Sequence, residues 1–345
     1  MRTPQARGRR KTGPSIRDVA KLAGVSAQTV SRVSTGVDPV RPETRDKVLE
    51  AMRQVGYSPN HAARALRLGK FGAIGLMAHR YARTGEALIA ASVIDAAEAH
   101  GYSVNLISIQ TPDKDHWETA AHRISHQAID GLVIIRAEMA TPDTLTLPAG
   151  LPVVVSDSRL IGHYPAVTAD QTGGSRMAVE HLLSLGHRTV HHLAGPLDSE
   201  PALIRSAGWS RTLELAGCEV PEPWIGDWTP GCGYAFGVRA AADPSVTAVY
   251  AANDEMAIGF MRGLHENGRR VPEDVSVVGF DGLDLGAYVY PPLTTIKHPF
   301  ATIGSMLVDT MLEQIRKRGT GFVAPPRTVV PVDLVVREST AGPPG

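Results

Sequence analysis

A short segment near the amino terminus combines hydrogen-bonding side chains with small ones, and reads Ser26, Ala27, Gln28, Thr29, Val30, Ser31 and Arg32. An arginine can bond guanine twice through O6 and N7, and a glutamine can bond adenine through N6 and N7. Ala27 can at most touch a thymine methyl group. The short hydroxyl side chains suit contacts to phosphate, which set the register of a protein on a duplex. The chemistry available to this segment is therefore that of reading a DNA groove, provided that the chain presents it on a helix.

The pattern around this segment predicts two short helices joined by a tight turn. Residues 16–23 place their apolar side chains at i, i+3, i+4 and i+7, which is one face of a helix. Gly24 readily turns the chain at the end of that helix, and Ser26 stands where the N-cap of a second helix belongs. Val30 and Val33 can pack inward on the first helix, which leaves the hydrogen-bonding side chains facing outward. A second helix of this size fits the major groove, so the arrangement predicts a helix-turn-helix.

The next residues predict a third helix and a shorter segment after it. Pro42 suits a first helical turn, and Gly56 can end the helix. Its buried stripe would consist of Val48, Leu49, Met52 and Val55. Three short helices around one small core are typical of a DNA-binding headpiece. Residues 58–69 then read as one more short helix, with Ser58 as its cap.

Charge is distributed unevenly along a chain whose net charge is zero. Residues 1–70 hold 15 Lys and Arg against 5 Asp and Glu, whereas the remainder holds 20 against 30. A basic amino-terminal module on an acidic body is typical of a protein that binds a polyanion. Residues 1–13 have no apolar period, so we expect a disordered basic tail that adds nonspecific attraction to phosphate.

Composition also limits the environment and the chemistry of the protein. No apolar run approaches the roughly 20 residues of a membrane span, and the amino terminus lacks the apolar stretch of a secretory signal, so we expect a cytoplasmic protein. Cys218 and Cys232 make no disulfide framework. No Cys or carboxylate joins His187, His191 and His192 at ligand spacing, so we expect no metal and no other cofactor. No G-x-S-x-G motif or phosphate-binding P-loop occurs, which argues against an enzyme.

Beyond Gly69, short apolar strands alternate with helices. The predicted strands are residues 73–77, 103–109, 131–135, 152–156, 189–194, 248–251 and 276–279. The helices predicted between them include residues 87–100, 175–185 and 256–266. Near-continuous apolar strands that alternate with helices are typical of parallel sheets covered on both faces. So many strands exceed one compact unit, and we expect two sheets with a cleft, where ligands bind outside the carboxyl ends of the strands.

Further short motifs follow one another along the chain in a fixed order. In the amino-terminal part they are Asp18-Val19-Ala20, Ala23-Gly24-Val25-Ser26, Thr29-Val30-Ser31-Arg32, Thr44-Arg45, Gly56-Tyr57-Ser58-Pro59-Asn60 and Ala65-Leu66. In the body they are Gly174, Glu180-His181-Leu182, Leu185-Gly186-His187, Ala194-Gly195-Pro196, Arg205, Gly208-Trp209, Ala252-Asn253-Asp254, Val277-Val278-Gly279-Phe280-Asp281 and Pro292-Leu293-Thr294-Thr295-Ile296. In this order and spacing, from about residue 15 to about residue 338, the chain resembles the lactose-repressor (LacI) family of transcription regulators.

The resemblance implies a fold class and a division of the chain. It implies an all-α helix-turn-helix headpiece and an α/β core like that of periplasmic sugar-binding proteins, with two doubly wound parallel-sheet subdomains. The expected parts are a basic tail at 1–13, the headpiece at 14–58, a hinge helix and linker at 59–70, the core at 71–340 and a flexible tail at 341–345. The subdomains would comprise about 71–168 with 300–326, and about 169–297 with 327–340.

The resemblance also implies how DNA would be bound. The expected contact residues are Ser26, Ala27, Gln28, Thr29, Ser31, Arg32, Asn60 and Leu66. In the family, the leucines equivalent to Leu66 of two subunits wedge into the operator from the minor groove and open a kink. The chain ends in a polar, Gly- and Pro-rich tail without the leucine heptads that make some relatives tetramers. We therefore expect a homodimer that binds an approximately palindromic operator.

For the small-molecule cleft, the resemblance implies the residues His79, Arg83, Asp157, Arg205, Trp228, Asn253, Asp281 and Phe300. Carboxylate, guanidinium and amide groups together can bond adjacent sugar hydroxyls as acceptors and donors. Trp228, in the setting Gly-Asp-Trp, can lay its ring on the apolar face of a pyranose. His79 and Arg83 differ in size and charge from the small or apolar residues of the lactose repressor at these places, which argues against lactose itself.

The resulting hypothesis is a transcriptional repressor that an inducer sugar releases from its operator. The Gly-Asp-Trp setting of Trp228 favours a galactoside-like sugar. A purine or other co-repressor is the alternative effector, since the family includes such members and the sign of the effect is not in the sequence. Two other classes remain as competitors: a cytoplasmic sugar-binding protein without a DNA role, and an enzyme such as a sugar kinase or hydrolase.

Overall fold

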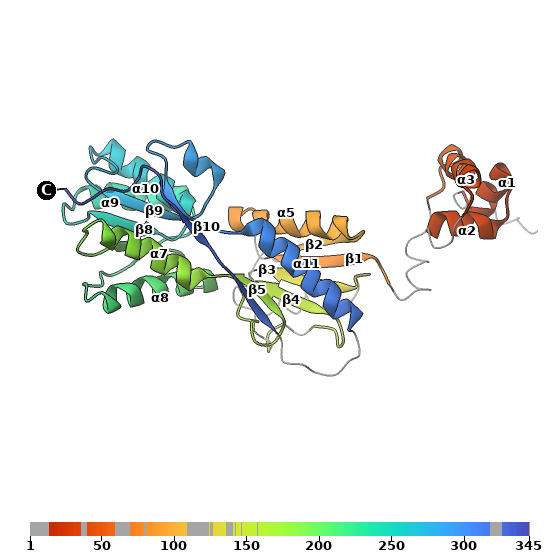
Figure 1. The fold of residues 1–345 in the computed structure, drawn as a ribbon, viewed down its shortest axis with the longest axis horizontal. Coiled ribbons are helices and arrows are strands. Elements are labelled where there is room, and N and C mark those ends of the chain that lie inside the picture. Colours follow the sequence, from red (N-terminus) through yellow and green to blue (C-terminus); the bar gives the residue numbers. More distant parts are fainter. Residues whose placement is uncertain are drawn as a thin grey trace, which may run out of the picture. The chain divides into compact units, whose positions relative to one another are not determined.

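A computed structural model of the chain divides into two compact units, Met1–Phe71 and Gly72–Gly345. It describes residues 14–35, 40–58, 70–78, 81–108, 127–135, 147–156, 158–317 and 326–344, together with 124, 141 and 143–145. In the first unit the described residues form helices, and in the second they form α/β layers (Figure 1). Among the described residues, none of the helices is both long enough and apolar enough to cross a membrane.

The first unit is a bundle of short helices, namely α1 (Ile16–Ala23), α2 (Ala27–Thr35) and α3 (Pro42–Val55). Val19, Val30 and Val48, one from each helix, are completely buried and meet in its core. Val33, Leu49 and Val55 pack against this core while partly buried. The three predicted headpiece helices and their apolar stripes are therefore confirmed. The basic tail expected at 1–13 and the short helix expected after Ser58 lie outside the described residues.

Local capping explains where these helices begin and end. The Ser26 hydroxyl accepts a hydrogen bond from the Thr29 backbone N–H at 3.0 Å, which satisfies one of the donors at the start of α2. Gly24 and Gly56 end α1 and α3 with φ of 67° and 66°, in the left-handed region where glycine is favoured. The N-cap and the two stops predicted from the sequence are thus present.

The second unit contains two sheets, each of six strands in the part of the chain that the structure describes. The first has the order β11-β5-β4-β3-β1-β2 and is parallel throughout. Its strands are β1 (Ala73–Ala78), β2 (Ser103–Ser108), β3 (Gly131–Ile135), β4 (Val153–Ser156), β5 (Ala166–Ala169) and β11 (Arg327–Val330). Helices α5 (Thr84–Ala99) and α11 (Phe300–Arg316) pack on each other beside this sheet (Figure 1).

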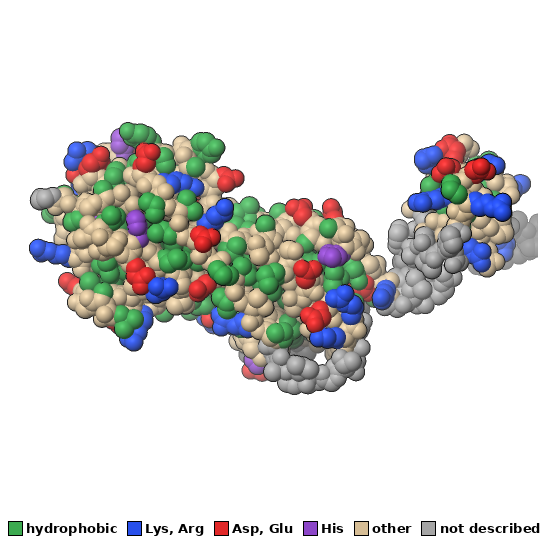
Figure 2. All heavy atoms as spheres, in the orientation of Figure 1, with side chains coloured by type: hydrophobic (Ala, Val, Ile, Leu, Met, Phe, Trp, Pro, Cys, Tyr) green, Lys and Arg blue, Asp and Glu red, His purple; other side chains and the backbone are tan. Residues whose placement is uncertain are grey.

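The second sheet has the order β12-β10-β9-β8-β6-β7. Its strands are β6 (His191–Ala194), β7 (Trp224–Ile225), β8 (Ala248–Ala251), β9 (Ser276–Asp281), β10 (Thr294–Lys297) and β12 (Asp333–Val335). All neighbours are parallel except β10 and β12. Around it lie α7 (Gln171–Ser184), α8 (Glu200–Leu215), α9 (Pro230–Ala241), α10 (Asp254–Glu266) and the short 3-10 helix η1 (Asp284–Ala287). On the face drawn in Figure 2, acidic and basic side chains of the α/β unit are interspersed.

The two parallel sheets confirm the predicted fold class, and each predicted strand corresponds to an observed one. One boundary differs from the expected division. Arg327–Val330 pairs with β5 in the first sheet, whereas residues 327–340 were expected in the second subdomain. The chain therefore crosses back only after Val330, because β11 extends the edge of the first sheet before β12 joins the second.

Helices α9 and α10 pack with their backbones in contact because glycines line the interface. A Cβ at Gly233 would lie 2.1 Å from the Met256 carbonyl oxygen, and a Cβ at Gly259 would lie 1.9 Å from the carbonyl oxygen of Pro230. No larger side chain fits there without moving a backbone. The two helices therefore form a rigid pair. The loops that precede them contain Trp228 and Asn253, which line a cleft described in the next subsection.

We expect Gly259→Ala to lower the free energy of unfolding of the α/β unit by about 1–3 kcal/mol, because the added methyl group overpacks the interface. Urea denaturation of the full chain measures this change. The matched control is Gly231→Ala in the first turn of α9, where the nearest atom to an added Cβ is the Thr229 hydroxyl at 3.9 Å. That control should keep or slightly raise the stability, since alanine is the better helix former. Equal loss in both variants would contradict the interpretation.

Candidate functional site

The predicted DNA-reading residues lie on α2 and its cap. Ala27, Gln28 and Arg32 are exposed, whereas Thr29 and Ser31 are half-buried. Of the eight expected contact residues, Asn60 and Leu66 fall outside the described residues. The described part of the headpiece thus presents an amide and a guanidinium on one exposed helix, next to the capped helix start at Ser26.

A small cleft lies within the second unit, where the carboxyl ends of strands of the second sheet face the start of α5. It is lined by Arg83, Thr84, Gly85, Arg205, Trp228, Asn253, Glu255 and Asp281. The first three residues precede or begin α5, and the others belong to the second subdomain. The cleft therefore lies between the two subdomains, at the strand ends where ligands of parallel sheets bind.

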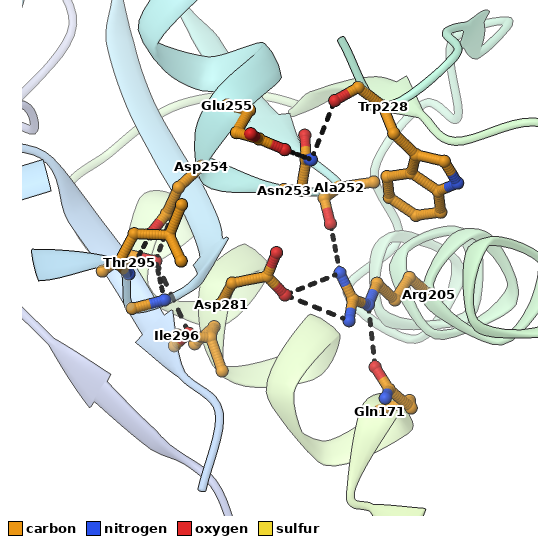
Figure 3. A network of polar contacts seen from close by, with 12 residues as sticks. Gln171, Arg205, Trp228, Ala252, Asn253, Asp254, Glu255, Asp281, Thr295 and Ile296 are labelled. Atoms are coloured by element: carbon orange, nitrogen blue, oxygen red, sulfur yellow. Dashed lines mark hydrogen bonds and ion pairs between the residues drawn. The ribbon is translucent and has the colours of Figure 1, made fainter. Parts of the chain in front are cut away.

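Arg205 is the central group of this cleft. Its side chain is completely buried, and its Nε donates to Gln171 Oε1 at 2.7 Å while Nη1 donates to the Ala252 carbonyl (Figure 3). The guanidinium also stacks over the Phe280 ring, with 3.6 Å from Cζ to the ring centroid. A buried guanidinium needs such partners because taking its charge out of water is costly. Its plane is therefore fixed before any ligand arrives.

Asp281 supplies the counter-charge at the end of β9. Its Oδ1 lies 3.5 Å from both Nη1 and Nη2 of Arg205. This separation is longer than the roughly 2.7–2.9 Å of a tight charge-assisted bond, so a ligand hydroxyl can join the pair or tighten it. Asp281 has a φ of 114°, which is unusual for a residue with a side chain. Such strain at a strand end is a common feature of functional sites.

Trp228 and Asn253 form one wall of the cleft. Trp228 has a φ of 73°, and its ring packs so closely on Gly195 that a Cβ there would lie 2.4 Å from a ring atom. Asn253 Nδ2 donates to the Trp228 carbonyl at 3.1 Å, and Asn253 Oδ1 accepts from the Met256 backbone N–H at 3.0 Å. The asparagine therefore caps α10 and also holds the tryptophan loop.

A second carboxylate, Asp254, lies buried next to this network. Thr295 Oγ1 donates to its Oδ1 at 2.5 Å, and the Leu283 backbone N–H donates to its Oδ2 at 2.7 Å. Burial, together with the negative charge of Asp281, raises the pKa of Asp254 to about 8. Asp254 is therefore largely protonated at neutral pH and supports the loop after β9.

The structure brings together most of the cleft residues expected from the sequence. Arg83, Arg205, Trp228, Asn253 and Asp281 line one cavity. Phe300 does not line it, and stacks instead on His298 with 4.2 Å between ring centroids at the start of α11. The expected residues His79 and Asp157 fall outside the described residues.

Sequence reasoning missed two polar residues that line the cleft, Thr84 and Glu255, and also Gln171, which holds Arg205. Gln171 begins the helix that follows β5, and that strand was itself not predicted. Thr84 and Glu255 stand within the first two residues of α5 and α10. Attention to helix starts that follow predicted strands would have found Thr84 and Glu255, but not Gln171.

The histidines near β6 have structural surroundings in the described part of the chain. His192 is completely buried between Trp209 and Tyr250, and burial lowers its pKa to about 4. Burial likewise lowers the pKa of His187 and of His191. Among the described residues, no group of three or more His, Cys, Asp or Glu side chains could hold a metal ion.

Comparison with known proteins gives two family matches. Residues 15–60 match "Bacterial regulatory proteins, lacI family", and residues 179–340 match "Periplasmic binding protein-like domain". The "Lactose operon repressor" of Escherichia coli (strain K12) is 34% identical over 336 residues, covering 95% of this chain and 91% of the relative. The "HTH-type transcriptional repressor PurR" of Pasteurella multocida (strain Pm70) is 33% identical over 341 residues, covering 94% and 98%.

A solved structure matches the fold over nearly the whole chain. It is the lac repressor dimer bound to operator and the anti-inducer ONPF, with a TM-score of 0.84 and 32% identity, and the match covers 96% of this chain and 100% of that one. Headpiece and α/β core thus occur in the same order in a protein that has been seen on DNA.

Asp254 generates a prediction on pH. Its pKa is raised in the folded protein to about 8 from the ordinary 3.8. Between these values the folded chain holds a proton that the unfolded chain has released, so the contribution of Asp254 to stability falls as pH rises. We expect the free energy of unfolding of the wild type, minus that of Asp254→Asn, to decline from about pH 5 to about pH 8, with a slope of up to about 1.4 kcal/mol per pH unit.

Urea denaturation of both proteins across this pH range is the measurement. His192 has a lowered pKa, so its contribution to the free energy of unfolding increases as pH rises, opposite to that of Asp254. Because both proteins contain His192, this contribution cancels in the difference between them. A difference that does not vary with pH would show that Asp254 is ionised in the folded protein.

Proposed function

Because the chain belongs to the lacI family of bacterial regulatory proteins, we propose that it represses transcription by binding operator DNA as a homodimer, under the control of a sugar effector. The single observation that carries the effector part is the buried, fully oriented Arg205 in a cleft between two subdomains. The DNA part is supported by the exposed amide and guanidinium on α2.

For DNA binding, α2 is the recognition helix. Gln28 and Arg32 bond base edges in the major groove, and the hydroxyl residues at and near the helix start bond phosphates. The headpiece core of fully buried valines holds this helix against α1 and α3. A homodimer with two such headpieces requires an operator with approximate two-fold symmetry. The lac repressor dimer on its operator is the corresponding assembly among relatives.

For the effector, the lining of the cleft favours an uncharged, polyhydroxylated molecule. The cations Arg83 and Arg205 are balanced by the carboxylates of Glu255 and Asp281. Arginine donors next to a carboxylate can bond adjacent hydroxyls as a matched set. Trp228 adds an aromatic wall for the apolar face of a sugar ring. A galactoside-like sugar fits this set of groups, and a purine is the alternative that the test below distinguishes.

The proposed control is a shift between two states of the dimer. Effector binding closes the cleft and moves the first subdomain of each protomer, so that the hinge segments at 59–70 lose their contact and DNA affinity falls. The effector has to bind the two states with unequal affinity, because equal affinity shifts nothing. A co-repressor would use the same parts with the opposite sign.

Arg32 generates a prediction on DNA. We expect Arg32→Ala to weaken operator binding by about 1–3 kcal/mol and to relax the preference at one base pair, because a bidentate contact to guanine is lost. Fluorescence titration of duplexes selected from genomic DNA measures this, at several salt concentrations. Arg53→Ala removes the same charge from α3, where Arg53 pairs with Glu50, and should leave the sequence preference intact. The DNA role is wrong if the wild type binds selected and random duplexes equally.

Arg205 generates a prediction on the effector. A saturating ligand at about 100 times its Kd stabilises the folded chain by about 2.7 kcal/mol. We expect a panel of galactosides, other sugars and nucleobases to contain a compound that raises Tm, and Arg205→Lys to abolish the rise because lysine lacks the planar fork of donors. The control Arg176→Lys changes an exposed arginine paired with Glu180 and should keep the rise. A full rise in Arg205→Lys would overturn the assignment of the cleft.

A further inference from the structure

One hydrogen bond joins the two subdomains directly across the cleft. Thr84, the first residue of α5, donates from Oγ1 to Glu255 Oε1 at 2.8 Å. Glu255 is the second residue of α10, and its other oxygen, Oε2, lies 3.5 Å from Asn253 Nδ2 (Figure 3). The two residues are separated by 171 positions in the sequence. The bond therefore joins two separate layers across the cleft and does not belong to a local turn.

The surroundings favour a carboxylate at this point. Both α5 and α10 begin here, and the first turn of a helix stabilises negative charge through its unpaired N–H groups. Glu255 and Thr84 are both half-buried, so water screens their contact less than it would at the open surface. On the side of the first subdomain, Arg83 precedes Thr84 and pairs with the buried Glu86 at 3.7 Å. A charged acceptor is thus held between two helix starts.

The second subdomain is rigid near Glu255, so this contact acts on the whole wall of the cleft. Glu255 belongs to α10, which is locked to α9 by glycine contacts and carries the Asn253 cap that holds Trp228. A displacement of Glu255 therefore displaces the start of α10 and, through Asn253, the Trp228 wall of the cleft. Asn253 connects the bridge to the expected ligand residues.

We propose that Thr84 and Glu255 form a latch that raises the fraction of effector-free molecules whose cleft is closed. The latch supplies part of the free energy of closure from the protein itself, and effector binding supplies the rest. Because the apparent affinity of a ligand that binds the closed state equals its intrinsic affinity multiplied by the closed fraction, the latch also sets how tightly an effector is held. It rests on the proposed two-subdomain clamp, and is independent of the identity of effector and operator.

The test uses the full chain without effector or DNA. Spin labels at Glu98→Cys on α5 and Ala242→Cys after α9 lie on exposed positions of the two subdomains, in a background where Cys218 and Cys232 are serine. Pulsed electron–electron double resonance then gives the distribution of distances between the two labels, and hence between the subdomains. We expect the protein with Thr84 to show a closed and an open population, and we expect Thr84→Val, which removes the hydroxyl and keeps the shape, to lower the closed fraction.

A double-mutant cycle separates the latch from nonspecific damage. Glu255→Ala should shift the distribution as Thr84→Val does, and the double variant should shift it no further, since one bond is lost in each case. Thr84→Ser keeps the hydroxyl and should restore the closed population. The matched control is Tyr234→Phe, which removes a hydroxyl–carboxylate bond of 2.6 Å to Glu266 between α9 and α10, within one subdomain. It should leave the distribution unchanged.

The outcomes decide the proposal without reference to ligand binding. An unchanged distribution in Thr84→Val and in Glu255→Ala, with circular dichroism showing both variants folded, would overturn the latch. Additive shifts in the double variant would also overturn it, because they would show that the two side chains act separately. A purified chain that binds neither sugar nor DNA would refute the proposed function and leave this experiment interpretable.

Discussion

The burial of the Arg205 guanidinium is the constraint on which the cleft depends. Removing an ion from water costs several kcal/mol unless its donors and its charge are matched. Here the partners come from separate elements: Gln171 from the start of α7, the Ala252 carbonyl after β8, and Asp281 at the end of β9. These elements have to keep their positions around the arginine, because any displacement would leave a buried donor without a partner.

The same constraint gives two neighbouring carboxylates different charge states. Asp281 faces the guanidinium and is the counter-ion, whereas Asp254 is buried without a comparable cation and takes a raised pKa. Two negative charges this close in a buried site would repel each other. One carboxylate therefore faces the cleft, and the other, protonated, joins the Leu283 backbone and the Thr295 hydroxyl next to it.

Sequence patterns predicted the elements whose signal is local. Residues 131–135 form a run of buried apolar residues and were found, as were the three headpiece helices with their caps. The strands β7 and β12 were missed because they have only 2 and 3 residues and lie at the edges of their sheet, where one side of a strand is exposed. β5, β10 and β11 were missed as well.

The site was predictable only as far as the family resemblance carries residue identities. It indicated Arg205, Asn253 and Asp281, which line the cleft. It also suggested Phe300, which is not among the residues that line the cleft and whose ring stacks on His298. Contacts between side chains far apart in sequence, such as Thr84 with Glu255, leave no periodic signal in either segment. Such pairs are determined by how the layers meet, and only the three-dimensional structure reveals them.

The placement of these residues also explains how one scaffold can serve different ligands and operators. Gln28 and Arg32 are exposed on α2, and Thr84 and Glu255 stand at helix starts, so their replacement disturbs little of the apolar core. By contrast, the valines of the headpiece core and the glycines between α9 and α10 fix backbone positions. Because changes at exposed positions usually cost little stability, recognition can vary while the framework stays. Arg205 belongs to both groups, because it lines the cleft and its burial also makes it part of the framework.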